Sequence, residues 1–175
     1  MSVITNTTVI INFAAIGRLD LLRRLFGAIH LPTEVYAEIL DGQAEGYTFL
    51  NGIESLIAPL TTDGWLLLIS QEGDEELRRY GTLPAGLHRG EAACLAIAGN
   101  RNWLLLTDDR AARAEARRQH ITLSGSIGCL VLAVERGVST LDEANTDLAA
   151  MITQGYHAPL TDLGPLIKRD PQGLG

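Results

Sequence analysis

The sequence contains few cysteines and no long uninterrupted apolar segment. Cys94 and Cys129 are its cysteines, and both lie within apolar, helix-like patterns. Two isolated cysteines support neither a disulfide framework nor a zinc cluster, so we expect small core residues in a reducing compartment. No run approaches the roughly 18 apolar residues of a membrane span, and the amino terminus lacks a basic segment followed by a long apolar run. The sequence therefore predicts a cytoplasmic protein without a membrane partner.

Motifs of several enzyme classes are also missing. The patterns GxGxxG, GxxxxGK[ST], GxSxG and paired CxxC do not occur, and the histidines show no HExxH or HxxxH spacing. These absences leave dinucleotide, P-loop, serine-hydrolase and zinc sites without support.

Positive charge is scarce in this chain. The formal net charge is −7 at pH 7, and Lys168 is the single lysine among 14 Lys and Arg residues. Non-specific affinity for nucleic acid comes mainly from cationic contacts to phosphate, so this balance argues against a general nucleic-acid coating protein. It leaves room for an acidic metal site that meets nucleic acid.

The chain has the size and composition of one compact domain. It has 175 residues with 46% hydrophobic content, which favours a single domain over residues 1–175. Short apolar runs predict strands at 3–5, 65–69, 103–106 and 121–123. Helical spacing predicts helices over 9–16, 19–26, from 31, near 49–56, from 73, over 91–99, over 111–120, from 126 and over 141–152. This alternation predicts an α/β fold with a mainly parallel sheet covered on both faces.

Polar residues follow the predicted strands. Asn6 comes after the first strand, Asp108 and Asp109 follow 103–106, and Ser124 follows 121–123. Ligands of parallel sheets bind beyond the carboxyl ends of the strands. We therefore expect these residues to meet at one edge of the sheet.

Two glutamates lie on the inward faces of predicted helices. Glu91 shares a helical stripe with Leu87 and Leu95, and Glu38 shares one with Leu31 and Val35. Burying an unpaired carboxylate is costly, so both positions favour metal binding. The alternatives are a helix-capping role for Glu91 and a solvated boundary position for Glu38.

The acids after 103–106 have two interpretations. One of Asp108 and Asp109 is expected to cap the following helix, which leaves the other for a site, and spacing does not say which. Arg110 begins an arginine-rich helix that forms either a cationic ridge near the acids or a solvated face.

Hydroxyl and amide side chains also flank the expected edge. Asn6 and Thr7 are candidates both for capping the first helix and for contacting a ligand. Ser124 and Ser126 either cap the next helix or touch a phosphate at its amino end.

Six segments stand out when the motifs are taken in chain order: Ile4-Thr5-Asn6-Thr7-Thr8, Gly17-Arg18-Leu19-Asp20-Leu21-Leu22, Leu31-Pro32-Thr33-Glu34-Val35-Tyr36-Ala37-Glu38, Gly90-Glu91-Ala92-Ala93, Thr107-Asp108-Asp109-Arg110 and Gly125-Ser126-Ile127-Gly128. Their order resembles the PIN-domain family, and within it the branch related to VapC-type toxin ribonucleases. The resemblance covers about residues 2–140 and leaves a helical tail over about 141–175.

The resemblance implies an α/β/α sandwich that binds Mg²⁺ or Mn²⁺ and cleaves single-stranded RNA. Glu38, Glu91, Asp108 and Asp109 match the family's metal-binding acids, and Asn6 stands where the family usually has Asp. The resemblance also implies a homodimer and a small antitoxin protein that blocks the site. Substrate contacts would come from the side chains Thr7, Arg110, Ser124 and Ser126.

The asparagine at position 6 leaves a second interpretation open. An amide retains an oxygen but removes one negative charge, which weakens metal affinity. The alternative function is a catalytically silent PIN module that binds RNA or a partner protein. A third reading is an unrelated metal-dependent phosphohydrolase on a similar sheet.

Overall fold

A computed structural model describes residues 1–167 and contains a six-stranded sheet whose paired strands are all parallel. This confirms the predicted α/β class. The spatial order is β3-β4-β2-β1-β5-β6. The strands are β1 (Val3–Thr5), β2 (Ile29–Pro32), β3 (Ile57–Ala58), β4 (Leu66–Ile69), β5 (Leu104–Leu106) and β6 (Leu123–Ser124).

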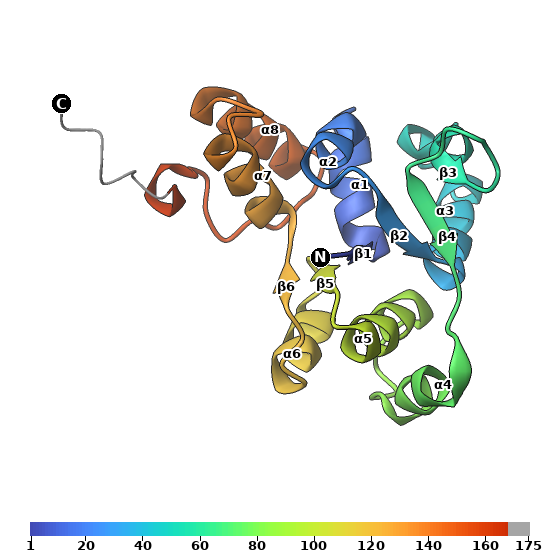
Figure 1. The fold of residues 1–175 in the computed structure, drawn as a ribbon. Coiled ribbons are helices and arrows are strands. Elements are labelled where there is room, and N and C mark those ends of the chain that lie inside the picture. Colours follow the sequence, from blue (N-terminus) through green and yellow to red (C-terminus); the bar gives the residue numbers. More distant parts are fainter. Residues whose placement is uncertain (168–175) are drawn as a thin grey trace.

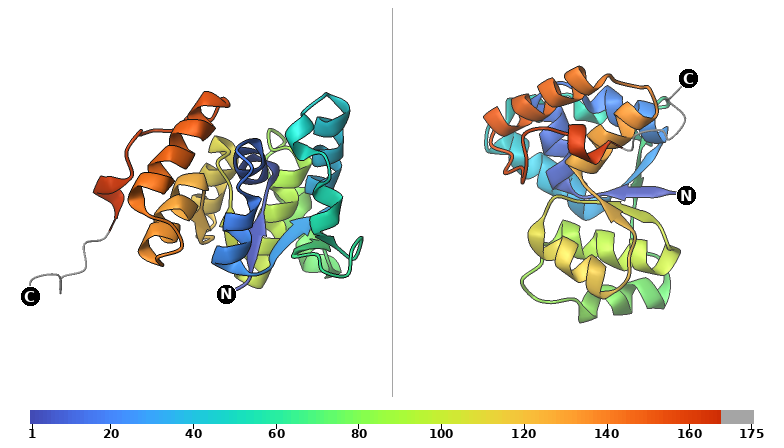
Figure 2. Two further views of the ribbon diagram at one scale, coloured as in Figure 1. Left: turned by 90° about the horizontal axis from the view of Figure 1, so that it is seen from above. Right: turned by 90° about the vertical axis from the view of Figure 1, so that its left-hand side faces the viewer.

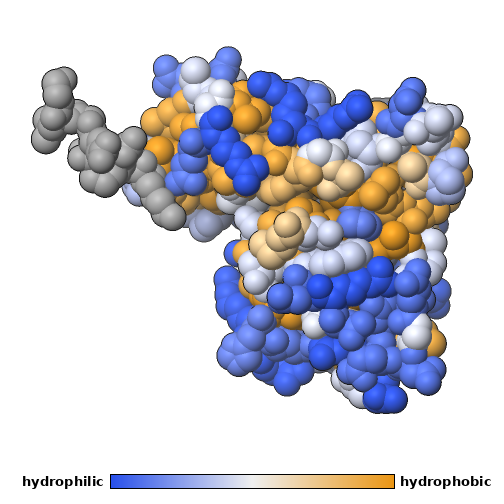
Figure 3. All heavy atoms as spheres, in the orientation of Figure 1, coloured by the Kyte–Doolittle hydropathy of each residue, from blue (hydrophilic) through white to orange (hydrophobic). Residues whose placement is uncertain are grey.

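Helices cover both faces of the sheet, as the sandwich prediction requires (Figure 1, Figure 2). The helices are α1 (Thr7–Ala15), α2 (Leu19–Phe26), α3 (Thr33–Ala44), α4 (Gly73–Thr82), α5 (Arg89–Arg101), α6 (Arg110–Arg118), α7 (Ser126–Glu135) and α8 (Leu141–Thr153). Helices α4, α5 and α6 form one layer, and the other helices form the opposite layer (Figure 1). The outer surface of the α4–α6 layer is mostly hydrophilic in the view of Figure 3.

The central strands are buried on both sides. Ile4 of β1 and Leu105 of β5 are completely inaccessible, as are Phe13 of α1 and Leu95 of α5 from the two helical layers. A strand covered on both faces exposes neither face to solvent. This explains why the sequence of β5 is a continuous apolar run without polar alternation. Cys94 and Cys129 are buried and unpaired, in agreement with their predicted core role.

The sequence analysis missed two short strands. Ile29–Pro32 forms β2, so the helix predicted from residue 31 begins instead at Thr33. Two short 3-10 turns, Thr48–Leu50 and Ile53–Leu56, occupy the region predicted as a helix near 49–56, and β3 follows them. A strand of two to four residues is too short to show a clear two-residue periodicity. Its sequence pattern therefore cannot be distinguished from that of the first turn of a helix.

The chain leaves α8 in an irregular segment. This segment ends in a 3-10 turn at Gly164–Leu166. The predicted helical tail over about 141–175 is thus helical mainly in α8, and its residues 168–175 lie outside the described part of the chain. Within residues 1–167, no helix has both the length and the apolar composition needed to cross a membrane.

A buried ion pair joins α4 to the end of α5. Glu76 is 1% exposed and accepts hydrogen bonds from Nε and Nη2 of Arg101 at 2.6 and 3.0 Å. The Glu72 N–H and the Asn100 side chain complete its shell. Burial raises the pKa of the Glu76 carboxyl, but the hydrogen bonds from Arg101, Glu72 and Asn100 outweigh it and lower the pKa to about 2. The Arg101 guanidinium also lies 5.0 Å from the Trp103 ring centre.

We predict that Glu76→Gln lowers the free energy of unfolding by about 3 kcal/mol at pH 7, because it removes the buried counter-charge of Arg101 and leaves the exposed Glu72 carboxylate at 3.6 Å as its ion-pair partner. Urea denaturation measures this change. The folded pKa lies below the ordinary value of 4.5. The stabilisation is therefore complete above pH 4.5 and disappears as the pH falls toward 2, so the gap to the wild type should narrow over that interval. Glu75→Gln, which removes an exposed partner of Arg78 and Arg79, is the matched control and should cost at most about 1 kcal/mol. An equal loss in the free energy of unfolding for the two variants would contradict the stabilising role of the buried Glu76–Arg101 pair.

Candidate functional site

The sheet reverses its winding direction at β1. The chain runs from β1 through β2 and β4 on one side, and β5 and β6 lie on the other side. Such a switch point opens a crevice beyond the carboxyl ends of the strands. The register pairs Thr5 with Leu106, so Asn6 and Thr107 come next to each other at this edge. The predicted meeting of polar residues at one edge of the sheet therefore centres on the β1–β5 pair.

The Asn6 side chain connects the ends of β1 and β5. Its Nδ2 donates to Thr107 Oγ1 at 2.7 Å, and its Oδ1 accepts from the N–H and the hydroxyl of Thr8 at 3.2 and 2.7 Å. Asn6 is 2% exposed and is the N-cap of α1. The side chain thus has the capping role that the sequence allowed, and both of its polar atoms are hydrogen-bonded within the protein.

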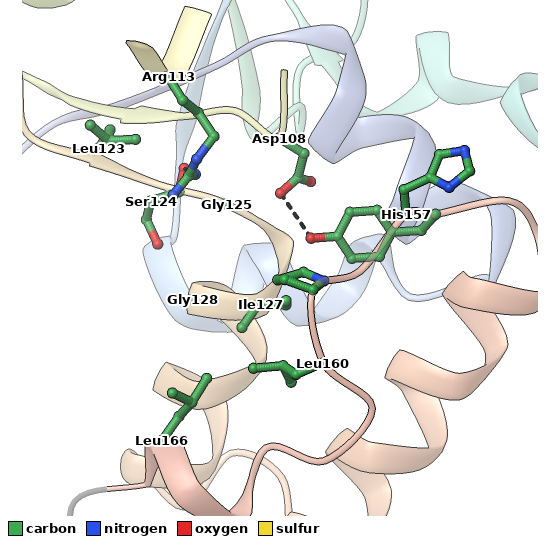
Figure 4. Close-up of a pocket in the computed structure, with 12 residues that line it drawn as sticks. Asp108, Arg113, Leu123, Ser124, Gly125, Ile127, Gly128, His157, Leu160 and Leu166 are labelled. Atoms are coloured by element: carbon green, nitrogen blue, oxygen red, sulfur yellow. Dashed lines mark hydrogen bonds between the residues drawn. The ribbon is translucent and has the colours of Figure 1, made fainter. Parts of the chain in front are cut away.

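Asp108 ties the end of β5 to α1, α7 and the segment after α8. Its Oδ1 accepts from the Ser126 N–H at 2.9 Å, and its Oδ2 accepts from the Ser126 hydroxyl at 2.5 Å and from Asn12 Nδ2 at 2.9 Å. The Tyr156 hydroxyl donates to Oδ1 at 3.3 Å (Figure 4). Both oxygens of this carboxylate are therefore engaged in structural hydrogen bonds.

The Asp109 carboxylate accepts fewer hydrogen bonds than that of Asp108. Its Oδ1 accepts from the Ala112 N–H at 2.7 Å, which makes it the N-cap of α6. Its own N–H donates to Thr107 Oγ1 at 3.1 Å. The sequence expected one of the adjacent acids to cap the arginine-rich helix, and the structure assigns that cap to Asp109. Within residues 1–167, its Oδ2 accepts no hydrogen bond, so this oxygen remains available to a ligand.

Glu38 reaches from α3 to the amino end of α5. Its Oε1 accepts from the Gly90 N–H at 2.9 Å, and its Oε2 accepts from the Thr7 hydroxyl. A Cβ atom at position 90 would lie 2.7 Å from Glu38 Oε1, closer than real Cβ contacts allow. Glycine at position 90 therefore permits the carboxylate to approach the helix start.

Glu91 lies in the first turn of α5 and is 8% exposed. Its Oε2 accepts from the His88 N–H at 2.9 Å, so the predicted capping role is present. Burial raises the pKa of the Glu91 carboxyl most strongly, the His88 N–H lowers it, and the charges of Asp109 and Glu38 raise it again. The net pKa of Glu91 is raised, chiefly because its carboxyl is buried.

Two hollows flank these carboxylates, and each contains an acid and an exposed arginine. A hollow of about 370 Å³ includes Glu38, His88 and Arg89 in its lining. A second hollow of about 310 Å³ includes Asp109 and Arg110. Neither arginine takes part in an ion pair within the described residues, so both guanidinium groups are available to an anionic ligand.

The remaining predicted residues have mixed roles. Thr7 donates to Glu38 and Ser126 donates to Asp108, so these hydroxyls position acids. Ser124 lines a separate cavity near Asp108 (Figure 4). Asn12 and Tyr156 escaped the sequence analysis. Asn12 carried a signal, since it is a polar residue in the apolar run of α1, whereas Tyr156 meets Asp108 only through the tertiary fold.

The donor chemistry of this edge suits a hard divalent cation. Carboxylate oxygens are the ligands that Mg²⁺ and Mn²⁺ prefer. Across residues 1–167, no group of three or more His, Cys, Asp or Glu side chains is placed so that it could hold a metal ion. Mg²⁺ usually keeps several waters and binds through one or two carboxylates together with substrate phosphates. Glu91 and Asp109 each keep one carboxylate oxygen without a hydrogen bond within residues 1–167, and these two oxygens suit that kind of partial coordination.

Comparison with protein-family models identifies the family. The family model DUF3368, which describes a PIN domain, matches residues 2–169. No curated protein and no solved structure matched the chain. The family match extends beyond the residues on which the sequence resemblance rested and includes α8 with the segment that carries Tyr156.

We predict that the adjacent acids differ in their effect on stability. Asp108→Asn places an amide where several donors converge and should lower the free energy of unfolding by about 2 kcal/mol. Asp109→Asn keeps a good N-cap residue and should change it by less than about 0.5 kcal/mol. Urea denaturation of the two variants side by side tests this difference. The same loss in both variants would contradict the structural assignment of Asp108.

Proposed function

The chain belongs to the PIN-domain family, and on this premise we propose that it is a metal-dependent endoribonuclease that hydrolyses phosphodiester bonds of single-stranded RNA. The observation that carries the proposal is the placement of acids at the switch point of the sheet, where Glu38 accepts the N–H of Gly90, the neighbour of Glu91, and Asp109 follows Thr107 at the end of β5. The proposal includes a role as the toxin of a toxin–antitoxin pair, a homodimeric state and a location in the cytoplasm.

PIN domains generally use divalent metal ions. In this chain Glu38, Glu91 and Asp109 would hold Mg²⁺ or Mn²⁺, and their mutual repulsion favours a cation between them. The bound ion supplies Lewis-acid polarisation of the phosphoryl group and a lowered pKa for an attacking water. Asn6 and Asp108 act indirectly, because their hydrogen bonds fix the strand ends that carry the other residues.

Arg89 and Arg110 complete the substrate site on its two sides. Each lies in the lining of a hollow beside an acid, and each is solvent-exposed. A guanidinium group binds phosphate oxygens in a planar, bidentate way. An RNA strand that crosses the acids would thus meet one arginine upstream and one downstream of the phosphate to be cleaved.

A specific observation supports a second function, a catalytically silent PIN module that binds RNA or a partner protein. Asn6 lacks the charge of an aspartate, and its amide is fully used by Thr8 and Thr107. The Asp108 carboxylate is likewise occupied by internal donors. Glu38 also accepts hydrogen bonds at both oxygens, so of the acids at this edge Glu91 and Asp109 each keep one oxygen without an internal donor within residues 1–167.

We predict that the wild type cleaves labelled single-stranded RNA with Mn²⁺ or Mg²⁺. The Glu91→Gln variant should lower the cleavage rate by about 100-fold or more, because it removes one of the carboxylates that would hold the metal ion. Asn6→Asp should raise metal affinity roughly tenfold, since ligand charge sets the affinity of such sites. Gel analysis of RNA fragments over a metal titration measures both effects.

The matched control is Glu45→Gln, which removes an exposed glutamate at the end of α3 and should leave cleavage unchanged. Cleavage by Asn6→Asp alone would favour the silent module. Absence of cleavage in all variants, including Asn6→Asp, would overturn the nuclease proposal.

We further predict that Arg89→Gln and Arg110→Gln weaken RNA binding and make it less dependent on salt. Each lost phosphate contact should reduce the slope of log K against log salt by about 0.7, the value for single strands. Fluorescence anisotropy at several salt concentrations measures this slope. Arg23→Gln on α2 removes an exposed arginine away from the site and should leave the slope unchanged. If the slope falls equally in the Arg23→Gln variant, the arginines affect RNA binding through net charge alone, and the predicted phosphate contacts of Arg89 and Arg110 are wrong.

A further inference from the structure

A third cavity borders the candidate site on the side of α7. Its volume is about 400 Å³, within the range of small-molecule sites, and it shares Asp108, Tyr156 and His157 with the hollow that contains Asp109 and Arg110. The segment after α8 supplies one wall, and the β6–α7 connection supplies the opposite wall (Figure 4). The cavity is therefore adjacent to the proposed path of the RNA backbone.

The floor of this cavity is apolar. Ile127, Leu160 and Leu166 lie together at the end distant from Asp108 (Figure 4). Polar groups gather at the other end, where Asp108, Ser124 and the Tyr156 hydroxyl lie. A site with apolar walls and a few convergent polar groups suits a ligand with a flat apolar face and hydrogen-bonding edges.

The two charged groups of the cavity offset one another. Asp108 carries a negative charge and Arg113 a positive one, and both line the cavity. Nη1 of Arg113 donates to the carbonyl oxygens of Thr107 and Ser124 at 2.8 and 3.2 Å, which fixes the guanidinium in the wall. A lining with balanced charge suits a neutral ligand with hydrogen-bonding groups.

The Ser124 hydroxyl is available for such a ligand. Among residues 1–167 it makes no hydrogen bond, and it lies beside Gly128 (Figure 4). A Cβ atom at position 128 would collide with Ser124 Oγ, so glycine there gives the hydroxyl its room. The glycines of the Gly125-Ser126-Ile127-Gly128 motif thus shape the cavity as well as the start of α7.

We propose that this cavity binds one nucleobase of the RNA strand, from a nucleotide next to the phosphate that lies at Glu38, Glu91 and Asp109. The inference rests on the proposed nuclease function. Unstacked bases in single-stranded RNA are neutral, planar and rich in hydrogen-bonding groups, and proteins bind them by stacking and edge contacts. His157 is exposed and lines both adjoining hollows, so a base at the boundary between them would contact this residue.

The test is an abasic scan of the RNA combined with a variant that fills the cavity. A fluorescent RNA decamer is prepared with one abasic nucleotide at each position in turn, and binding is followed by anisotropy. Ca²⁺ replaces Mg²⁺ as a hard oxygen-binding cation, and gels verify that the RNA stays intact. For the wild type we expect one position at which loss of the base weakens binding about tenfold, a typical stacking contribution.

Leu160→Trp fills the cavity and should abolish this sensitivity to the abasic position. Leu77→Trp makes the same change at an exposed site on α4 and should retain the sensitivity. Thermal unfolding checks that both variants fold. If Leu160→Trp does not fold, His157→Ala serves instead, because an exposed histidine can be removed without disturbing the core.

The outcomes separate this inference from the proposed function. RNA cleavage with no abasic position of special effect would overturn the base-binding cavity and leave the nuclease intact. Sensitivity that persists in Leu160→Trp and His157→Ala, or that is lost in Leu77→Trp, would place the base contact elsewhere and also overturn it. A wild type that neither binds nor cleaves RNA would overturn both proposals.

Discussion

Hydrogen bonds between carboxylates and the first N–H groups of helices hold the candidate site together. Glu38 accepts from the start of α5, Asp109 from the first turn of α6 and Asp108 from the start of α7. These helix ends carry partial positive charge and unsatisfied donors. They allow several acids to gather at one edge of the sheet, although the acids repel one another. The arrangement depends on the pairing of β1 with β5, which places the helix starts around a single crevice.

The acids at this edge divide into two groups by their hydrogen bonding. Asp108 is engaged by Asn12, Ser126 and Tyr156, so its contribution is to join β5 to α1, α7 and the segment after α8. Asp109 and Glu91 each retain an oxygen without a partner within residues 1–167. Asn6 in place of an acid suits the first group, because its amide donates to Thr107 while its oxygen accepts from Thr8. With Asn6 the site has one negative charge fewer than it would have with Asp, and hydrogen bonds fix the strand ends that surround it.

Much of the fold followed from local patterns. The apolar runs of β1, β4 and β5 and the helical stripes between them predicted the parallel sheet and its covered faces. The short strands β2 and β3 escaped, because a buried run of a few residues looks the same at a helix start as in a strand. The sequence also indicated candidate acids. A charged residue on an inward helical stripe, such as Glu91, is costly to bury unless it is paired or binds a cation.

The sequence by itself determined the fold class and the edge of the sheet at which Asn6, Asp108 and Asp109 lie. Periodicity and element order carry this information, because parallel strands direct their carboxyl ends to the same side. Only the tertiary structure decided which of Asp108 and Asp109 is tied into structural hydrogen bonds, and only it brought Tyr156 and His157 beside them. Contacts of this kind join segments that are distant in the chain, and they depend on side-chain directions that no local pattern specifies.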